Sequence, residues 1–286
     1  MFDLIPYGLS PDEFIKMALA EDIGDGDQTS LSTVAEGKKS IAKVKVKEDG
    51  IIAGIPVAIH ILQCVDKTLK VQTYTSDGAM VQNGNIVMEI EGNVRSLLQA
   101  ERLLLNCIQR MSGIATLTRK FVDAVNGTGA EILDTRKTTP NFRHFEKLAV
   151  RAGGGINHRF GLYDMILIKD NHVDACGGIN NALLKAEEYL LKTGKKLFIE
   201  IETRNIVEVE EVMKSNIVKR IMLDNFETAD LVKAVKIINK KFETEASGGI
   251  TLSNVYSYAA TGVDYISVGA ITHSYKSLDI SMKIGK

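Results

Sequence analysis

The chain has 286 residues, of which 45% are hydrophobic and 25% are charged, and its formal net charge at pH 7 is -1. This composition is typical of a soluble globular protein with one large domain or two smaller ones. Because the chain as a whole is nearly neutral, its overall charge does not attract nucleic acid, and any anion site must come from a local arrangement of side chains.

The N-terminal segment and the cysteines indicate where the protein resides. Residues 1–27 carry early acidic residues and lack the basic segment and apolar core of a signal peptide. No apolar run approaches the roughly 20 residues that cross a bilayer. The cysteines, Cys64, Cys107 and Cys176, are odd in number and far apart, which is typical of a reducing compartment. We therefore expect a cytoplasmic protein with no membrane span and no nucleic-acid partner.

The first part of the chain changes its periodicity twice. Ser10 as N-cap and Pro11 after it predict a helix over residues 10–20. Alternating apolar and polar residues in IAKVKVKEDG, LKVQTYTSDG and NIVMEIEG predict an antiparallel sheet with one solvated face between residues 40 and 94. A broad apolar stripe then predicts a helix over residues 95–126.

The second part of the chain repeats one unit. Short apolar runs alternate with amphipathic stretches, which predicts parallel strands joined by crossover helices. The runs are EILD (131–134), MILIKD (165–170), LFIEIE (197–202), RIMLDN (220–225), FETEASGG (242–249) and YISVGA (265–270). Each ends in polar or small residues, as at the active-site rim of a barrel, and no GxGxxG turn favours an open doubly wound sheet. We predict an α/β protein with a mixed α/β domain over residues 1–113 and an α/β barrel over residues 114–286.

The segment from Asp134 to His172 concentrates positive charge. It holds seven of the 35 Lys and Arg residues and three of the five histidines, on short polar turns between apolar runs. Most charge runs are solvated surface. Here the cations alternate with three consecutive glycines, residues 153–155, which allow a ligand to approach the backbone closely. The segment therefore favours a small ligand with several negative charges.

Three groups of side chains are expected to meet at the barrel mouth. Fixed positive charge comes from Arg136, Lys137, His158, Arg159 and Lys169. Glu200 and Asp224, each at a strand end, accept hydrogen bonds from hydroxyls, hold magnesium directly or through water, or pair with a rim cation. The small-residue turns after the last two strands either bind phosphate through backbone N–H groups or only reverse the chain; they are Ser247-Gly248-Gly249 and Val268-Gly269-Ala270. His273 reaches the same phosphate or caps a helix.

No motif for a nucleophile, a zinc ion or a Walker phosphate loop occurs in the chain. A site rich in Arg, Lys and carboxylates without such a motif predicts catalysis by orientation and charge.

Five segments together resemble one enzyme family. DTRKTTP, EKLAVRAGGGINHRFGLYDMILIKDNH, LDNF, EASGGI and SVGAITHS are similar to the quinolinate phosphoribosyltransferases, or nicotinate-nucleotide pyrophosphorylases (carboxylating), and the similarity covers nearly the whole chain. The resemblance implies an N-terminal α/β sandwich, an incomplete α/β barrel, and final residues that pack back on the first domain. It implies the joining of quinolinate to phosphoribosyl pyrophosphate with Mg²⁺, giving nicotinate mononucleotide, pyrophosphate and CO₂ for NAD synthesis. It also implies a homodimer that shares each active site across its interface, with further association of dimers left open.

The resemblance assigns roles to individual residues of this chain. Lys137, Lys169, Glu200 and Asp224 are expected to be catalytic, and Glu200 and Asp224 to serve magnesium. The residues expected to bind quinolinate are Arg102 (from the partner subunit), Thr135, Arg136, Lys137, His158, Arg159 and Lys169. Those expected to bind the sugar donor are Lys137, Glu200, Asp224, Ser247, Gly248, Gly249, Val268, Gly269, Ala270 and His273.

One residue departs from the family pattern, and two other functions remain open. Asn141 stands where the family usually has glycine, and asparagine tolerates the left-handed conformation better than other non-glycine residues. The nearer alternative is a paralogous phosphoribosyltransferase-like protein of the kind associated with molybdenum transport, with another acceptor. The more distant one is a catalytically silent anion-binding protein on the same scaffold.

Overall fold

A computed structural model describes residues 8–285 of the chain. The prediction that the chain begins without a signal peptide concerns in part residues 1–7, which lie outside the described residues. Within the described range, every helix is too short or too polar to span a bilayer.

The chain forms two compact units, each built from separated segments. Unit 1 comprises Met1–Arg119, Thr138–Gly154 and Tyr275–Lys286, and unit 2 comprises Lys120–Lys137 and Gly155–Ser274.

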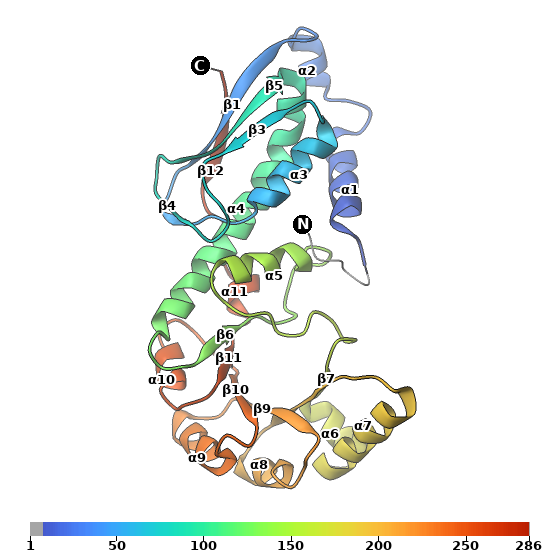
Figure 1. The fold of residues 1–286 in the computed structure, drawn as a ribbon, viewed down its shortest axis with the longest axis vertical. Helices are drawn as coiled ribbons and strands as arrows, with labels where there is room; N and C mark the ends of the chain where they lie inside the picture. The colour runs from blue at the N-terminus through green and yellow to red at the C-terminus, as the bar shows by residue number, and fades with distance from the viewer. Residues whose placement is uncertain (1–7, 286) are drawn as a thin grey trace. The chain divides into compact units, whose positions relative to one another are not determined.

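Unit 1 is built on a four-stranded antiparallel sheet with the strand order β12-β1-β5-β3, and β2 pairs with β4 beside it. Figure 1 shows α3 and α4 alongside this sheet. The last turn of α4 belongs to unit 2. The elements are α1 (Pro11–Ile23), α2 (Gln28–Thr33), β1 (Lys39–Val46), β2 (Gly50–Ile51), α3 (Ile55–Val65), β3 (Lys70–Thr73), β4 (Met80–Val81), β5 (Ile86–Asn93), α4 (Val94–Ala124), α5 (Arg143–Ala152) and β12 (Ile280–Ile284).

Local signals explain most of these elements. The predicted first helix is confirmed, because Ser10 accepts a hydrogen bond from the Glu13 main-chain N–H while the Glu13 carboxylate accepts one from the Ser10 N–H. The predicted antiparallel sheet and the long helix that follows it are confirmed as well. Helix α3 was not predicted, because its apolar sequence lies between strands and lacks a polar N-cap. Asn141 adopts a φ of 60°, the left-handed conformation that was expected of it.

Unit 2 contains the predicted parallel strands. Their order is β6-β11-β10-β9-β8-β7, and all neighbours run parallel. Among the described residues no strand pairing joins β6 to β7. Figure 1 shows α7, α8 and α9 along the outside of the strands. The elements are β6 (Glu131–Leu133), β7 (Ile166–Ile168), α6 (Asp170–Cys176), α7 (Ile179–Thr193), β8 (Ile199–Thr203), α8 (Ile206–Val212), β9 (Val218–Asp224), α9 (Thr228–Ile238), β10 (Glu243–Ser247), α10 (Val255–Ala259), β11 (Tyr265–Ser267) and α11 (Ala270–His273).

The strands of unit 2 are covered on both sides. All five residues of β8 are buried, as is expected of a parallel strand with helices outside and packed side chains inside. Ile201, Leu223, Ala246 and Ile266 have no exposed surface. Because parallel strands end at the same edge of a sheet, the polar residues at their carboxyl ends converge there.

Candidate active site

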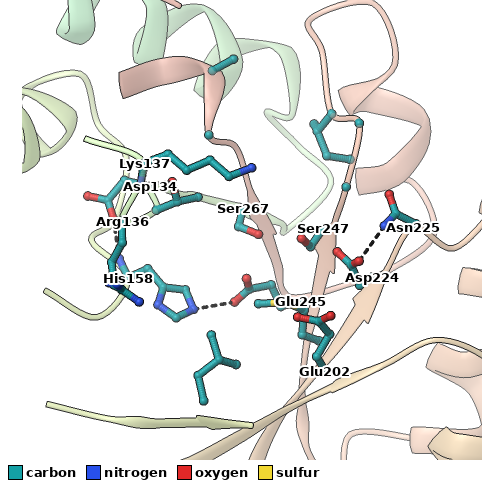
Figure 2. Close-up of a pocket in the computed structure, with 18 of the residues that line it drawn as sticks. Asp134, Arg136, Lys137, His158, Glu202, Asp224, Asn225, Glu245, Ser247 and Ser267 are labelled. Carbon is teal, nitrogen blue, oxygen red and sulfur yellow. Dashed lines mark hydrogen bonds and ion pairs between the residues drawn. The ribbon is translucent and has the colours of Figure 1, made fainter. Parts of the chain in front are cut away.

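A cavity of about 870 Å³ lies at the carboxyl ends of the parallel strands of unit 2. This is the end at which α/β barrels place their active sites. Figure 2 shows Arg136, Lys137 and His158 on one side of the cavity and Asp224 and Asn225 on the other. The lining residues are Asp134, Thr135, Arg136, Lys137, His158, Arg159, Leu167, Lys169, Glu202, Met222, Asp224, Asn225, Glu245, Ser247, Gly248, Gly249, Ile250, Thr251, Ser267, Gly269, Ala270 and His273.

Positive charges crowd one another in this cavity. Burial lowers the pKa of Arg159, and the neighbouring Arg136 guanidinium lowers it further. Two guanidinium groups that repel each other in a partly buried position are stabilised when an anion binds between or beside them. The cavity is therefore adapted to an anionic ligand.

Lys169 follows β7 and links the cationic residues to an acid of the next strand. Its Nζ lies 2.9 Å from Oε2 of Glu202, and its side chain is 47% exposed. Both residues line the cavity. An ion pair at this position leaves the ammonium group accessible to a ligand carboxylate.

The structure places Glu200 below the cavity and not at its rim, where the sequence predicted it. Glu200 has no exposed surface, does not line the cavity, and lies with Oε2 at 3.2 Å from Nε2 of His158. Burial and the nearby Glu245 carboxylate raise the pKa of Glu200 to about 7. The physical reason is the pleat of β8: residues i and i+2 face the same way, so Glu202 occupies the layer nearer the carboxyl end.

Asp224 ends β9 and is held by its neighbour in sequence. The Asn225 side-chain amide donates a hydrogen bond to Oδ2 of Asp224 at 2.6 Å, and the Asn225 main-chain N–H donates one to the Ser247 carbonyl at 2.8 Å (Figure 2). Asn225 adopts a φ of 56°. It therefore ties the acid at the end of β9 to the turn that follows β10.

The turn after β10 requires glycine. Gly248 has a φ of 95°, and a Cβ atom there would lie 2.1 Å from Oδ1 of Asn225. Gly249 follows with a φ of 61° and open space around its Cα. Consecutive small residues with positive φ leave backbone N–H groups accessible to an anion.

The turn after β11 brings Lys137 and His273 together. A Cβ atom on Gly269 would lie 3.0 Å from Cδ of Lys137 and 3.2 Å from Nε2 of His273. The Thr272 hydroxyl donates a hydrogen bond to the Lys137 carbonyl at 2.9 Å, which ties α11 to the loop after β6. Both cationic side chains therefore approach the backbone of one glycine turn.

Most of the residues predicted from the sequence line this single cavity, and three do not. Glu200 lies beneath it, Val268 is buried, and Arg102 has an exposed side chain on α4 of unit 1. The predicted residues in the lining are Thr135, Arg136, Lys137, His158, Arg159, Lys169, Asp224, Ser247, Gly248, Gly249, Gly269, Ala270 and His273.

Sequence reasoning missed several lining residues. Glu202 and Glu245 were readable from the alternation in IEIET and ETEAS, since each lies on the inward face of its strand near the carboxyl end. Asn225 was readable from its place after Asp224 at a strand end. Asp134 ends the run EILD and was placed at the rim by its position at a strand end, but it was given no role in the site.

Comparison with known proteins agrees with this fold. The family model for the quinolinate phosphoribosyl transferase N-terminal domain matches residues 27–112, and that for the C-terminal domain matches residues 114–283.

Named relatives and solved structures cover nearly the whole chain. Quinolinate phosphoribosyltransferase [decarboxylating] 2b, mitochondrial, from Nicotiana tabacum is 47% identical over 95% of this chain and 81% of its own. The probable nicotinate-nucleotide pyrophosphorylase [carboxylating] of Bacillus subtilis is 44% identical over 92% of this chain and 90% of its own. The structure of NadC from Streptococcus pyogenes matches with a TM-score of 0.92 and 37% identity over 98% of this chain and 99% of that one. The structure of the nicotinate-nucleotide pyrophosphorylase from Francisella tularensis matches with a TM-score of 0.90 and 39% identity, over 97% and 98% of the two chains.

These matches span both units and every strand that builds the cavity, and they do not favour the molybdenum-associated alternative. The chain belongs to the quinolinate phosphoribosyltransferase family.

Proposed function

We propose that this protein transfers the phosphoribosyl group of phosphoribosyl pyrophosphate to quinolinate and removes one carboxylate as CO₂, giving nicotinate mononucleotide and pyrophosphate. The observation that carries the proposal is the group of cations in one cavity, together with the lowered pKa of Arg159 beside Arg136. Quinolinate brings two carboxylates and the sugar donor brings several phosphate charges. A cavity with these cations gathered on one side suits both together.

The acceptor occupies the cationic side of the cavity. Arg136 and Arg159 bind carboxylates through two parallel N–H groups, and Lys169 adds a point charge. The pyridine nitrogen is already a nucleophile, so the protein needs to hold it near the anomeric carbon and requires no strong base.

The donor occupies the side on which the carboxylates and the glycine turns lie. As the bond to pyrophosphate breaks, positive charge develops on the ribose, and Glu202 and Asp224 are positioned to stabilise it. Glu202 takes the role that the family resemblance assigned to the buried Glu200. Lys137, His273 and the turns at Gly248 and Gly269 offer cationic groups and backbone N–H groups to the phosphates.

Loss of the carboxylate follows from the first step. Transfer of the ribose makes the ring nitrogen cationic. When the bond to the adjacent carboxylate breaks, its electron pair remains on the ring carbon, where the neighbouring positive nitrogen stabilises it. CO₂ leaves, and the carbon takes up a proton.

The donor set fits Mg²⁺ that is shared with the donor substrate. Magnesium prefers carboxylate oxygens, waters and substrate phosphates to an all-protein cage. Asp224 and Glu202 supply carboxylates, and among the described residues they are not part of a cluster of three ligand side chains. These two residues would hold the ion through substrate oxygens or water, and the ion would neutralise charge on the departing pyrophosphate.

The catalytic unit is proposed to be a homodimer. Arg102 is exposed on α4 and does not line the cavity of unit 2. The family resemblance assigns it to the quinolinate site of the partner subunit. In a symmetric dimer each subunit would lend its Arg102 to the other site.

A reducing, cytoplasmic location is proposed from the cysteines. Cys64, Cys107 and Cys176 are all free thiols in the structure, and burial raises the pKa of Cys107 to about 12, so it is an inert core residue. Some plant relatives are named as mitochondrial or chloroplastic proteins. Cell fractionation with an antibody against the protein would test the location.

The proposed reaction is tested by pyrophosphate release. The purified protein with Mg²⁺ should release pyrophosphate only when quinolinate and phosphoribosyl pyrophosphate are both present, in equal amount to the CO₂ formed. Binding of both compounds without release of pyrophosphate would overturn the proposal and support the silent anion-binding alternative.

A further inference from the structure

A layer of buried charge lies directly beneath the cavity. Glu200 on β8 and Glu245 on β10 have no exposed surface, and Arg220 on β9 is 9% exposed. The interior layers of such barrels are usually filled with branched apolar side chains. Charged groups in this position are costly unless they are paired, so their arrangement calls for a specific reason.

The two glutamates face a histidine of the cavity. Nε2 of His158 lies 3.2 Å from Oε2 of Glu200 and 3.4 Å from Oε2 of Glu245, and Figure 2 shows the ring pointing toward Glu245. Nδ1 of His158 accepts a hydrogen bond from the Arg159 main-chain N–H at 2.7 Å. The His158 main-chain N–H donates to Oδ1 of Asp134 at 2.8 Å.

All the contacts of His158 are compatible with a proton on Nε2. Burial alone would lower the pKa of His158, but the carboxylates of Glu200 and Glu245 raise it to about 9, which favours a doubly protonated ring. The hydrogen bond from the Arg159 N–H requires instead that Nδ1 carry no proton. The doubly protonated ring and the neutral ring both carry a proton on Nε2, which faces the two carboxylates.

Glu245 is itself fixed from below. Nη1 of Arg220 lies 3.0 Å from Oε2 of Glu245, and the other side of the same guanidinium binds Oε2 of Glu243 at 2.9 Å and 3.1 Å. The guanidinium also lies over the Tyr265 ring, 4.0 Å from its centroid. Burial raises the pKa of Glu245, but His158, Arg220 and a hydrogen bond from Ser267 outweigh it and keep that pKa below its usual value, which favours the anionic form.

We propose that Glu245 is a positioning residue of the acceptor site, which fixes the imidazole of His158 and, through its Nδ1, the main chain of Arg159. This inference rests on the proposed function. Arg220 fixes Glu245 in turn, so a chain of contacts runs from the strand interior to a guanidinium that faces the ligand. Glu245 lines the cavity, but it has no exposed surface, which is consistent with an indirect role.

The contacts predict which substrate is affected. Glu245 acts on His158 and, through it, on Arg159, which belong to the cationic side of the cavity. Glu245 also accepts a side-chain hydrogen bond from Ser267 at the end of β11, and Glu245→Gln keeps an oxygen that can accept this bond. The donor turn after β10 is held separately, because the Ser247 carbonyl accepts its hydrogen bond from Asn225. Loss of the Glu245 charge should therefore weaken the binding of quinolinate and leave the binding of the sugar donor nearly unchanged.

The test uses Glu245→Gln, which keeps the shape of the side chain and removes its charge. Calorimetry should show that the Kd for quinolinate rises at least about tenfold, as is typical when a group that orients a ligand-binding histidine is removed. The KM for phosphoribosyl pyrophosphate should stay within about twofold of wild type. If the quinolinate Kd stays within about twofold, or both substrates weaken equally, the proposal is overturned.

Glu243→Gln is the matched control. Glu243 lies on the same strand and binds the same Arg220, but it has no contact with His158 in the described structure. Its quinolinate Kd should remain within about twofold of wild type. An effect as large as that of Glu245→Gln would show that the network acts only through general stability, and this would contradict the proposal.

A double-mutant cycle tests whether Glu245 acts through His158. In a His158→Ala background, Glu245→Gln should change the quinolinate Kd by less than about twofold, because the group that it positions is gone. Full additivity of the two changes would contradict the proposal.

Two safeguards keep the outcomes separate. If Glu245→Gln does not fold, Glu245→Asp replaces it, because it keeps the charge but withdraws the carboxylate from His158. This variant should still weaken the binding of quinolinate selectively. A quinolinate Kd equal to that of wild type would overturn the proposal. The binding measurement needs no turnover. A wild-type protein that binds quinolinate but makes no product would contradict the proposed function and leave this test intact.

Discussion

At the scale of single residues, the cavity works because charges of the same sign are held close together. Burial and the Arg136 guanidinium both lower the pKa of Arg159. A bound anion reduces the repulsion between the two guanidinium groups, and a planar carboxylate accepts two hydrogen bonds from a guanidinium at once. The geometry of the charge therefore matters as well as its sign.

Arg159→Lys keeps the charge and removes the planar pair of donors. We expect the kcat/KM for quinolinate to fall about 10²-fold, comparable to the loss of one charge-stabilising contact in an active site. Arg204→Lys is the control, since Arg204 pairs with Asp174 and Glu208 and does not line the cavity. If the steady-state kinetics of both variants are near normal, Arg159 does not contact the substrate through a pair of hydrogen bonds.

The two acids of β8 differ by one layer of the barrel. The sequence predicted an acid at the end of this strand, but the choice between Glu200 and Glu202 depended on where the strand meets the rim. That position is set by the register with β7 and β9, which shifts at Ile199 and Glu200 in the β9 pairing. This register depends on the pairing between strands, so it cannot be predicted from the residues of β8 alone.

Glu202→Gln and Glu200→Gln separate the two positions. We expect Glu202→Gln to lower the kcat/KM for phosphoribosyl pyrophosphate about 10²-fold, because a carboxylate beside the developing ribose charge is lost. Glu200→Gln should leave the KM for this substrate within about threefold, since Glu200 is buried beneath the cavity. If Glu200→Gln impairs the kinetics with phosphoribosyl pyrophosphate and Glu202→Gln does not, then Glu200 is the carboxylate that acts on the sugar donor.

At the scale of elements, periodicity predicted the strands and longer helices well. The six parallel strands of unit 2 and the strands β1, β3 and β5 of unit 1 stand where the alternating or continuous apolar runs predicted them. Helix α3 and the short strands β2 and β4 were missed, because an apolar segment of 11 residues is ambiguous and two-residue strands carry no period. No strand was predicted at β12 either. The glycine turns were predicted from composition, but only the structure shows that Gly248 packs against Asn225.

The turn after β10 offers a direct test at this scale. Gly248→Ala places a Cβ atom 2.1 Å from Oδ1 of Asn225 at a φ of 95°. Asn225 and the turn must shift to relieve this contact, in addition to any cost of the positive φ that the neighbouring Gly249 shares. We expect the shift to cost phosphate binding about 1.4 kcal/mol or more, so the KM for phosphoribosyl pyrophosphate should rise about tenfold or more.

Gly249→Ala is the matched control for that turn. It also has a positive φ, of 61°, but a Cβ atom there meets no other atom within 4 Å. Its KM for the sugar donor should change by less than about threefold. If the two alanine variants behave alike, the contact with Asn225 does not shape the phosphate turn.

At the scale of the whole molecule, the chain passes repeatedly between its two units, so neither unit is one continuous segment. The last strand illustrates what a sequence cannot specify. β12 pairs with β1, matching Ile284 to Ala42, although the two strands stand at opposite ends of the chain. The sequence analysis predicted no strand here, and nothing local identifies its partner. The same limit applies to Arg102, whose proposed role depends on a second copy of the chain.

Subunit exchange tests this role. Arg102→Ala and Lys169→Ala should each be folded, dimeric and nearly inactive, and mixing them under exchange conditions should restore activity. In a heterodimer one of the two sites has both residues intact, so random mixing should restore about a quarter of the sites.

The control mixes Lys169→Ala with Arg159→Ala. Both residues line the cavity of the same unit, so every site in that heterodimer carries one defect and activity should stay low. If exchange is demonstrated by mass and the Arg102 mixture also stays inactive, the site is not shared between subunits.

The cations on one side of the cavity are expected to select a pyridine dicarboxylate, and the choice of acceptor tests this expectation most directly. With phosphoribosyl pyrophosphate and Mg²⁺ present, nicotinate mononucleotide should form from quinolinate and be detected by mass. Nicotinate lacks the carboxylate beside the ring nitrogen and would leave cations of the cavity without a partner. Its rate should be at least about 10³-fold lower, because a site built around a polar group rejects an analogue without it. Comparable rates with the two acids would contradict the account.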